Sequence, residues 1–295
     1  MREAIEWVDS YYNDSNRIVL TQNELQIPGL RMLGKHKMVH AIAPLPDHFH
    51  KDCFEFTFVT NGTISFSVKN TSYHLSGYDV FVTQPNEIHS TNLEPISKGE
   101  IIWFQLDAAQ TNNLLFLNAE SSSFLLSQLK VLNHSLIKIE NNSLLSEMKK
   151  VFRLSFHPEN KYYIANLLSF ILFHLIEYSH IDKDIITPDI KKSIDYIQTN
   201  ITSELSLDFL AKYISLSTSQ FKQKFKSQTG VAPRHYINMK KMEYSKQLLI
   251  NGLSITDVSM ALGFNTSSYY AAVFKKYNTC TPTQYKESEL LNKEQ

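Results

Sequence analysis

Residues 254–277 read SITDVSMALGFNTSSYYAAVFKKY, and this stretch decides the fold of the C-terminal part of the chain. Apolar side chains within residues 255–262 recur at spacings of three and four, which predicts a short helix with one buried face. Gly263 follows as the residue of a tight turn. Tyr270 and Phe274 then mark the inner face of a second helix. The order is helix, tight turn, helix.

The same order occurs earlier, in residues 206–230, which read SLDFLAKYISLSTSQFKQKFKSQTG. Phe221 and Phe225 correspond there to Tyr270 and Phe274, at an offset of 49 residues. A helix-turn-helix is the unit whose second helix enters the major groove of DNA. Two copies in register predict a DNA-binding domain far more strongly than one copy would.

Capping residues and a connecting helix complete the pattern. Hydroxyl side chains stand where each of the four short helices begins, at Ser206, Ser217, Ser254 and Thr266. Pro233 and Asn251-Gly252 bracket a connecting helix of about 18 residues, which corresponds to roughly 27 Å. Two adjacent major grooves on one face of DNA lie about 34 Å apart, so one chain can reach both.

These motifs resemble the DNA-binding domain of AraC/XylS-type transcription regulators. The residues that carry the resemblance are Phe225–Gly230, Leu248–Leu249, Ser254–Val258, Leu262–Phe264, Ser268–Tyr270, Phe274–Tyr277 and Thr281–Tyr285. Thr279 departs from the pattern, which usually has Gly there, so either Asn278 takes the left-handed conformation or the helix ends differently. Lys241 stands for the usual Arg of the connecting helix, and Ser245 for a small Ala.

The resemblance also implies where the domain contacts DNA. Base contacts are expected on the outward faces of the two second helices, at Ser219, Lys222, Gln223, Ser267, Ser268, Ala271 and Ala272. Backbone contacts are expected from Lys224, Lys226, Lys275 and Lys276. Lys and Gln can bind guanine and adenine edges, whereas Ala can only contact a thymine methyl group. We therefore expect the first unit to carry more sequence discrimination than the second.

The N-terminal part has the sequence pattern of a β domain. From about Val39 to Leu106, short runs of β-branched and aromatic residues alternate with turn signals, which is typical of a sandwich or small barrel. The clearest predicted hairpin joins residues 56–60 to residues 64–68 through Asn61-Gly62.

Several residues of this region resemble cupin motifs. In metal-binding cupins, residues in the positions of His48, His50, Glu55 and His89 hold a transition metal. Regulators of the family carry a cupin-like sensor, so we favour a small-molecule effector pocket at these residues, without a metal or other cofactor; a metal site and simple packing stay open. Trp103, which shares a strand face with Ile101 and Gln105, is either a stacking platform for a sugar effector or a core residue.

Two helical stretches follow, at residues 143–156 and 161–180. Apolar residues of the second stretch (Leu167, Leu168, Ile171, Leu172, Leu175 and Ile176) exceed what one small core needs, so we expect them to form a homodimer contact. The alternative is that this helix packs on its own barrel. Residues 162–178 include polar residues and do not predict a membrane span.

The expected fold class is α+β with two domains. The expected parts are a cupin-like β-barrel effector domain (1–142), a helical dimerisation region (143–180), a linker (181–188) and an all-α domain with two helix-turn-helix motifs (189–290).

Composition agrees with this division. The 295 residues contain 29 basic and 29 acidic side chains, so the net charge of zero would by itself argue against DNA binding. Residues 1–187 carry 15 basic and 20 acidic side chains, however, whereas residues 188–295 carry 14 and 9. Only two cysteines are present and residues 1–7 do not resemble a signal peptide, so we expect a cytoplasmic protein.

The sequence thus predicts a non-enzymatic, sequence-specific transcription regulator, with an activator favoured. Its expected partners are double-stranded DNA, a small-molecule effector, a second copy of the chain and RNA polymerase, with no membrane. Two alternatives stay open: a metal-dependent cupin enzyme with an appended helical domain, and a regulator that has lost its effector.

Overall fold

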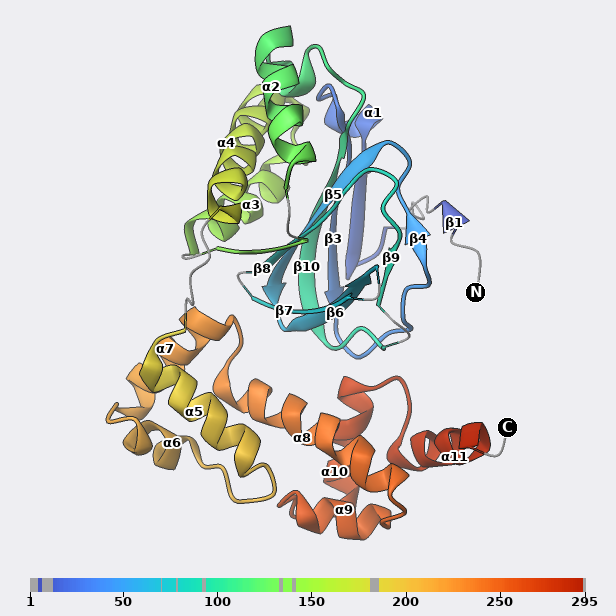
Figure 1. Cartoon of the computed structure of the whole chain (residues 1–295), viewed down its shortest axis with the longest axis vertical. Helices are drawn as coiled ribbons and strands as arrows, with labels where there is room; N and C mark the ends of the chain where they lie inside the picture. The colour runs from blue at the N-terminus through green and yellow to red at the C-terminus, as the bar shows by residue number, and fades with distance from the viewer. Residues whose placement is uncertain are drawn as a thin grey trace. The chain divides into compact units, whose positions relative to one another are not determined.

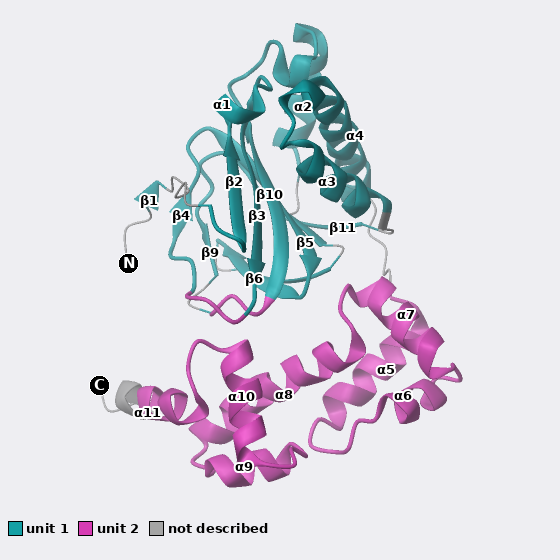
Figure 2. Cartoon of the chain, turned by 180° about the vertical axis from the view of Figure 1, so that it is seen from behind, with its two compact units in different colours: residues 1–39, 44–94, 99–183 teal, residues 40–43, 95–98, 184–295 magenta. Residues whose placement is uncertain are grey.

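The computed structural model divides the chain into two compact units (Figure 2). Unit 1 comprises residues 1–39, 44–94 and 99–183, and unit 2 comprises residues 40–43, 95–98 and 184–295. The structure describes residues 5–6, 13–69, 71–77, 79–91, 94–132, 135–139, 142–180 and 186–293. Most of the predicted linker and most of residues 1–7 lie outside the described residues.

Unit 1 contains two β-sheets (Figure 1). The five-stranded sheet has the order β1 (Ile5–Glu6), β4 (His48–Phe49), β9 (His89–Ser90), β6 (Thr63–Val68), β7 (Thr71–Ser76). The six-stranded sheet has the order β11 (Leu136–Lys138), β8 (Asp79–Thr83), β5 (Cys53–Asn61), β10 (Gly99–Asp107), β3 (Leu30–Met38), β2 (Arg17–Thr21). Within the described residues the pairings make two separate sheets and no closed barrel.

The six-stranded sheet has one apolar face and one partly polar face. Phe54, Phe56 and Phe58 of β5 alternate with Glu55 and Thr57, as expected for a strand. The apolar face packs against helices that lie together beside the sheet in Figure 1. The helical segments of unit 1 are α1 (Gln22–Leu25), η1 (Leu114–Phe116), α2 (Ala119–Lys130), α3 (Asn142–Leu154), η2 (Pro158–Asn160) and α4 (Lys161–Ser179). The two long predicted helices therefore match α3 and α4 closely.

The predicted hairpin is wrong in its pairing. The two strands and the turn at Gly62, which has φ +83°, are present. However, β5 pairs with β8 on one side and with β10 on the other, so it has no free edge for β6. The turn therefore carries the chain from one sheet to the other. A turn signal reports a change of direction but not which strand becomes the hydrogen-bonded neighbour.

The β region also begins earlier than predicted. β2 and β3 precede Val39 and form one edge of the six-stranded sheet, and β11 lies beyond Leu106 at the other edge. Leu30 and Leu33 of β3 are fully buried against the common core. Polar residues such as Lys35 and Lys37 interrupt the apolar alternation of β3, which hid this strand from the sequence pattern.

Unit 2 is all helical in its described main segment. Its helices are α5 (Pro188–Thr199), α6 (Leu207–Tyr213), α7 (Thr218–Thr229), α8 (Pro233–Ile250), α9 (Ile255–Ala261), α10 (Ser267–Tyr277) and α11 (Pro282–Lys293). Thr187 occupies the N-cap position of α5 and Pro188 is its first residue, so the last residue of the predicted linker already belongs to a helix. Among the described residues, no helix combines the length and the apolar character needed to cross a membrane.

Candidate nucleic-acid interface and effector site

The first helix-turn-helix consists of α6 and α7. The Ser217 side chain accepts a hydrogen bond from the Gln220 backbone N–H, and the Gln220 side chain accepts one from the Ser217 backbone N–H, so the predicted capping box is confirmed. Ser215 holds the turn in the left-handed region at φ +59°. Phe221 and Phe225 are fully buried. The opposite side of α7 therefore faces outward.

The second helix-turn-helix consists of α9 and α10 and repeats this construction. Thr266 caps α10 by accepting a hydrogen bond from the Tyr269 backbone N–H at 3.1 Å. Gly263 occupies the turn with φ +67°, at the place that Ser215 holds in the first unit. Tyr270 and Phe274 are fully buried, as predicted from their correspondence with Phe221 and Phe225.

Helix α8 connects the two helix-turn-helix motifs and has the predicted 18 residues. It contacts α7 in the first helix-turn-helix and both α9 and α10 in the second (Figure 1). Lys241 of α8 is buried, and its Nζ donates a hydrogen bond to the Leu262 carbonyl oxygen at 2.5 Å. This bond satisfies a carbonyl at the C-terminal end of α9, so Lys241 stabilises the turn between α9 and α10.

The end of α10 explains the departure at Thr279. Asn278 adopts an extended backbone with φ −127°, and its side-chain amide donates to the Phe274 carbonyl oxygen at 3.0 Å. This side-chain hydrogen bond ends the helix without a left-handed residue at Asn278. Of the two predicted alternatives, the structure therefore shows the one in which the helix ends differently from the usual pattern.

Known proteins resemble this chain in its C-terminal part. A family model described as a helix-turn-helix domain matches residues 210–288. An uncharacterised HTH-type transcriptional regulator of Staphylococcus aureus is 31% identical over 122 residues, which cover 39% of this chain and 16% of that protein. This chain thus spans about a sixth of that relative's length.

Two further proteins are similar to this chain. The lactose operon transcription activator of Staphylococcus xylosus is 22% identical over 247 residues, which cover 80% of this chain and 85% of that protein. Among solved structures, the C-terminal domain of AraT, a response regulator from Geobacillus stearothermophilus, is 25% identical with a TM-score of 0.34 and covers 35% of this chain and 86% of that one.

Residues 210–288 include α7 to α10 and thus both second helices. Over these residues the chain is similar to the family described as a helix-turn-helix domain. The sequence resemblance is confirmed for this domain.

In the C-terminal domain, α7 presents together the predicted base-contact residues of the first helix-turn-helix. Ser219, Lys222 and Gln223 are all exposed and lie on the side opposite the buried phenylalanines. Their side chains supply a hydroxyl, an ammonium group and an amide, which can read hydrogen-bonding groups of base edges.

Helix α10 presents a different surface. Ser268 and Ala272 are exposed, whereas Ser267 and Ala271 are only half-buried. The sequence reasoning missed Tyr269, which is 59% exposed and packs its ring 5.9 Å from that of Phe264. Tyr269 precedes Ala272 by three positions and so shares its helix face, which is the signal that could have identified it.

The four lysines predicted to contact the DNA backbone differ in their surroundings. Lys226, Lys275 and Lys276 are exposed. Lys224 instead forms an ion pair with Asp189 of α5, with 2.6 Å between Nζ and the carboxylate. This hydrogen bond lowers the pKa of Asp189 to about 2. Lys224 thus links α7 to α5 within the domain, and its predicted contact with phosphate would compete with this pair.

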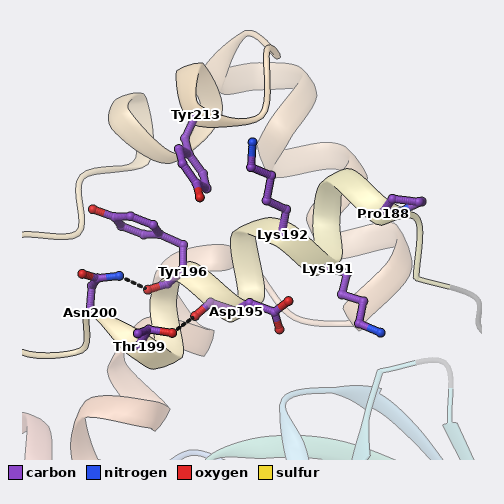
Figure 3. A pocket seen from close by; sticks show the side chains of 8 residues that line it. All are labelled: Pro188, Lys191, Lys192, Asp195, Tyr196, Thr199, Asn200 and Tyr213. Carbon is purple, nitrogen blue, oxygen red and sulfur yellow. Dashed lines mark hydrogen bonds between the residues drawn. The ribbon is translucent and has the colours of Figure 1, made fainter.

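A surface hollow of about 430 Å³ lies beside α5 (Figure 3). The rings of Tyr196 and Tyr213 lie there with their centroids 4.7 Å apart and their planes tilted by 49°, and Lys192 Nζ lies 4.5 Å from the Tyr213 ring. The hollow is open and carries charged groups, unlike the enclosed, mostly apolar pockets that bind small effectors. This hollow therefore does not have the features expected of a small-molecule effector pocket.

The predicted effector residues of unit 1 do converge. His48 on β4 is the register partner of His89 on β9, and their ring centroids are 4.1 Å apart. His50 lies within 5.4 Å of both rings. Its Nε2 is 3.0 Å from the Glu55 carboxylate on β5. All four residues are buried.

Gln105 of β10 is part of the same cluster, although the sequence reasoning did not count it as a site residue. Its amide nitrogen donates to the Glu55 carboxylate at 3.1 Å and lies 3.1 Å from His50 Nδ1. Gln105 is the register partner of Glu55 in the neighbouring strand, so the two side chains share one face of the sheet. A polar residue at an inward strand position was the signal for it.

Burial and neighbouring charges set the protonation of this cluster. Burial alone would raise the pKa of Glu55, but the adjacent His50 imidazole holds it well below its usual range. Burial, together with the charge of His48 when protonated, lowers the pKa of His89 to about 4. At neutral pH, Glu55 is therefore a carboxylate and His89 is a neutral imidazole.

Trp103 lies on the same face of β10 as Gln105, as the alternation predicts, but its ring is already packed. A Cβ atom added to Gly34, its register partner on β3, would lie 2.2 Å from the indole. The Arg17 guanidinium lies over the ring, 5.3 Å from its centroid. These contacts make Trp103 part of the packing of this face, so its predicted stacking on a sugar would require the ring to leave them.

The structure corrects the residues expected to form the dimer contact. Leu168, Ile171, Leu172, Leu175 and Ile176 are buried in the core of unit 1 itself, and Leu167 packs against that core. These apolar residues of α4 pack against the six-stranded sheet of their own unit, which was the alternative to a dimer contact. Other side chains of α4 remain exposed, among them Phe170 and Phe173, which are 46% and 39% exposed.

Proposed function

We propose that the chain is a sequence-specific DNA-binding transcription regulator that acts as an activator in the cytoplasm. One observation carries this proposal: two capped helix-turn-helix units, joined by one 18-residue helix, each present an exposed face on the second helix. The net positive charge of residues 188–295 supports it, because DNA affinity depends on neutralising phosphates.

In the proposed organisation, residues 1–142 form a cupin-like effector domain, residues 143–180 a dimerisation region, residues 181–187 a linker and residues 188–290, which begin with α5, the DNA-binding domain. The buried cluster of His48, His50, Glu55 and His89 supports a ligand site in the first part. A bound effector shifts the balance between two conformations only if its affinity for them differs, and that difference is what changes promoter engagement and contact with RNA polymerase.

The test is binding of the full chain to an operator selected from random duplexes, and to a panel of single-base-pair variants of it. We expect Lys222→Ala to relax discrimination at one or two positions by roughly 5- to 150-fold, the range for a lost base contact. Ala272→Gly should change discrimination at most about threefold, because a methyl contact contributes little.

Lys226→Ala serves as the backbone control, and should weaken binding to all sequences alike and reduce the salt dependence. Equal loss of discrimination from Lys222→Ala and Ala272→Gly would contradict the assigned asymmetry. Absence of any preferred sequence would contradict the proposed function.

The histidine cluster favours one competing function, a metal-dependent cupin enzyme. That function explains the cluster and leaves the helix-turn-helix domain without a role. The other alternative is a regulator without an effector. Thermal shift of the full chain against sugars, other metabolites and metals separates the three, because only a ligand-binding chain gains stability from a ligand.

A further inference from the structure

The two helix-turn-helix motifs differ at the third position of their second helices. At the offset of 49 residues that relates the motifs, Tyr269 of α10 corresponds to Gln220 of α7. The Gln220 side chain closes the capping box of α7 by accepting a hydrogen bond from the Ser217 backbone N–H. A capping box needs Glu or Gln at this position, so the Tyr269 side chain is not used for capping. It is instead 59% exposed.

The ring of Tyr269 is supported by the turn that precedes α10. Its centroid lies 5.9 Å from that of Phe264 in an edge-to-face arrangement, with the planes 60° apart. The Phe264 ring in turn packs on the buried Tyr270, at 5.5 Å between centroids. Such contacts restrict the Tyr269 side chain before any partner arrives, so less rotational freedom is lost on binding.

Tyr269 has two exposed neighbours along its side of α10. Ala272 follows it by three positions and Lys276 by seven, so the three residues lie on one side of the helix. Ala272 and Lys276 are both exposed. A ring, a methyl group and a predicted phosphate contact are thus presented together on the second helix of the motif.

The chemistry of this surface differs from that of α7. Ala271 and Ala272 of α10 stand where α7 has Lys222 and Gln223. Methyl groups do not hydrogen-bond to base edges, and the apolar feature that the major groove presents is the C5-methyl group of thymine. Alanine and aromatic side chains both make apolar contacts with that group. Tyr269 offers by far the larger apolar area of the two residue types.

We propose that Tyr269 is a specificity-determining residue of the second helix-turn-helix, and that its ring contacts thymine methyl groups in the second half of the operator. This inference rests on the proposed function and names the base pairs, A·T pairs, that the second motif selects. The first motif stays the more discriminating, because a methyl contact contributes less than a hydrogen-bonded base contact.

The experiment uses the full chain and the operator selected from random duplexes. Base pairs whose discrimination is relaxed by Lys222→Ala define the first half of the operator, and the second half lies one turn of the DNA helix away. Each thymine of the second half is replaced in turn by deoxyuridine, which removes only the methyl group. We expect binding to weaken about fourfold at one or more of these thymines, as estimated for one buried methyl group.

Variants of the chain then assign the contact to the ring. Tyr269→Ala should bind the thymine and deoxyuridine operators equally tightly, whereas Tyr269→Phe should keep the difference because it loses only the hydroxyl group. Phe209→Ala is the matched control, since Phe209 is a 42% exposed aromatic residue on α6, and should also keep the difference. Comparing two operators with one variant cancels any general loss of stability or affinity.

Three results would overturn the proposal. They are a second half without any sensitive thymine, the same sensitivity in Tyr269→Ala as in the wild-type chain, and a loss in Tyr269→Phe as large as in Tyr269→Ala, which would assign the contact to the hydroxyl group. In each case the chain would still select an operator, so the proposed function would stand. Absence of any preferred sequence would instead overturn both.

Discussion

At the residue scale, His235 shows how burial ties stability to pH. Its imidazole lies on α8 with Nδ1 3.3 Å from the Tyr277 hydroxyl of α10, and burial, with the nearby charge of Lys276, lowers the pKa of His235 to about 4. The unfolded chain has a histidine pKa of about 6.5. The folded state therefore binds fewer protons than the unfolded state between these values.

Because the folded pKa of His235 is depressed, its contribution to stability is present above pH 6.5 and is lost as the pH falls toward 4. We expect the free energy of unfolding to drop by about 2 kcal/mol from this residue between pH 7 and pH 5. Urea denaturation of the full chain, followed by circular dichroism, measures it. His235→Gln should remove this part of the pH dependence; an unchanged dependence in that variant would contradict the assignment.

At the element scale, the two helix-turn-helix motifs form the same turn with different residues. Ser215 and Gly263 both adopt left-handed backbone, at φ +59° and +67°. A side chain costs about 1–2 kcal/mol in this conformation, whereas glycine adopts it freely. A Cβ atom at position 263 would meet only Lys241 Nζ, at 3.7 Å, so space is not the constraint there.

The two positions therefore predict opposite effects. Gly263→Ser should lower the free energy of unfolding by about 1 kcal/mol, because it adds backbone strain. Ser215→Gly should raise it by about 0.5 kcal/mol, since the relieved strain exceeds the added entropy of the unfolded chain. Thermal or urea unfolding of the two variants measures both changes. Equal signs would show that turn strain is not the controlling factor.

At the scale of the whole molecule, the surface of α4 bears on assembly. Phe170 and Phe173 are exposed, and Phe173 stacks on Phe124 of α2 with ring centroids 6.4 Å apart. An exposed aromatic group of this kind is typical of an interaction surface. We propose it as the homodimer contact in place of the buried leucines and isoleucines.

Size-exclusion chromatography with light scattering should show a dimer for the wild-type chain. Phe170→Glu with Phe173→Glu should weaken dimerisation by roughly 100-fold, as expected for the loss of central aromatic contacts. Phe156→Glu is the control, since Phe156 is 49% exposed but lies after α3 rather than on α4. A monomeric wild-type chain, or an unchanged dimer in the double variant, would contradict the assignment.

The sequence by itself determined the helical half of this protein almost completely. The spacings around Phe221 and Tyr270, the caps at Ser217 and Thr266, and the length of α8 all agree with the structure. Helix spacing and capping depend on residues three or four positions apart, so local sequence contains the information. The opposite net charges of the two halves are likewise a property of composition alone.

Only the tertiary structure decided which strands pair and which polar groups meet. Asn61-Gly62 predicted a turn, but the absence of a free edge on β5 follows from its pairing with β8 and β10, which are distant in the chain. Gln105 joins Glu55 across 50 residues, and His89 meets His48 across a pairing of two-residue strands. These contacts depend on long-range pairing, because a side chain on a strand interacts mainly with side chains of neighbouring strands and less with residues near it in the sequence.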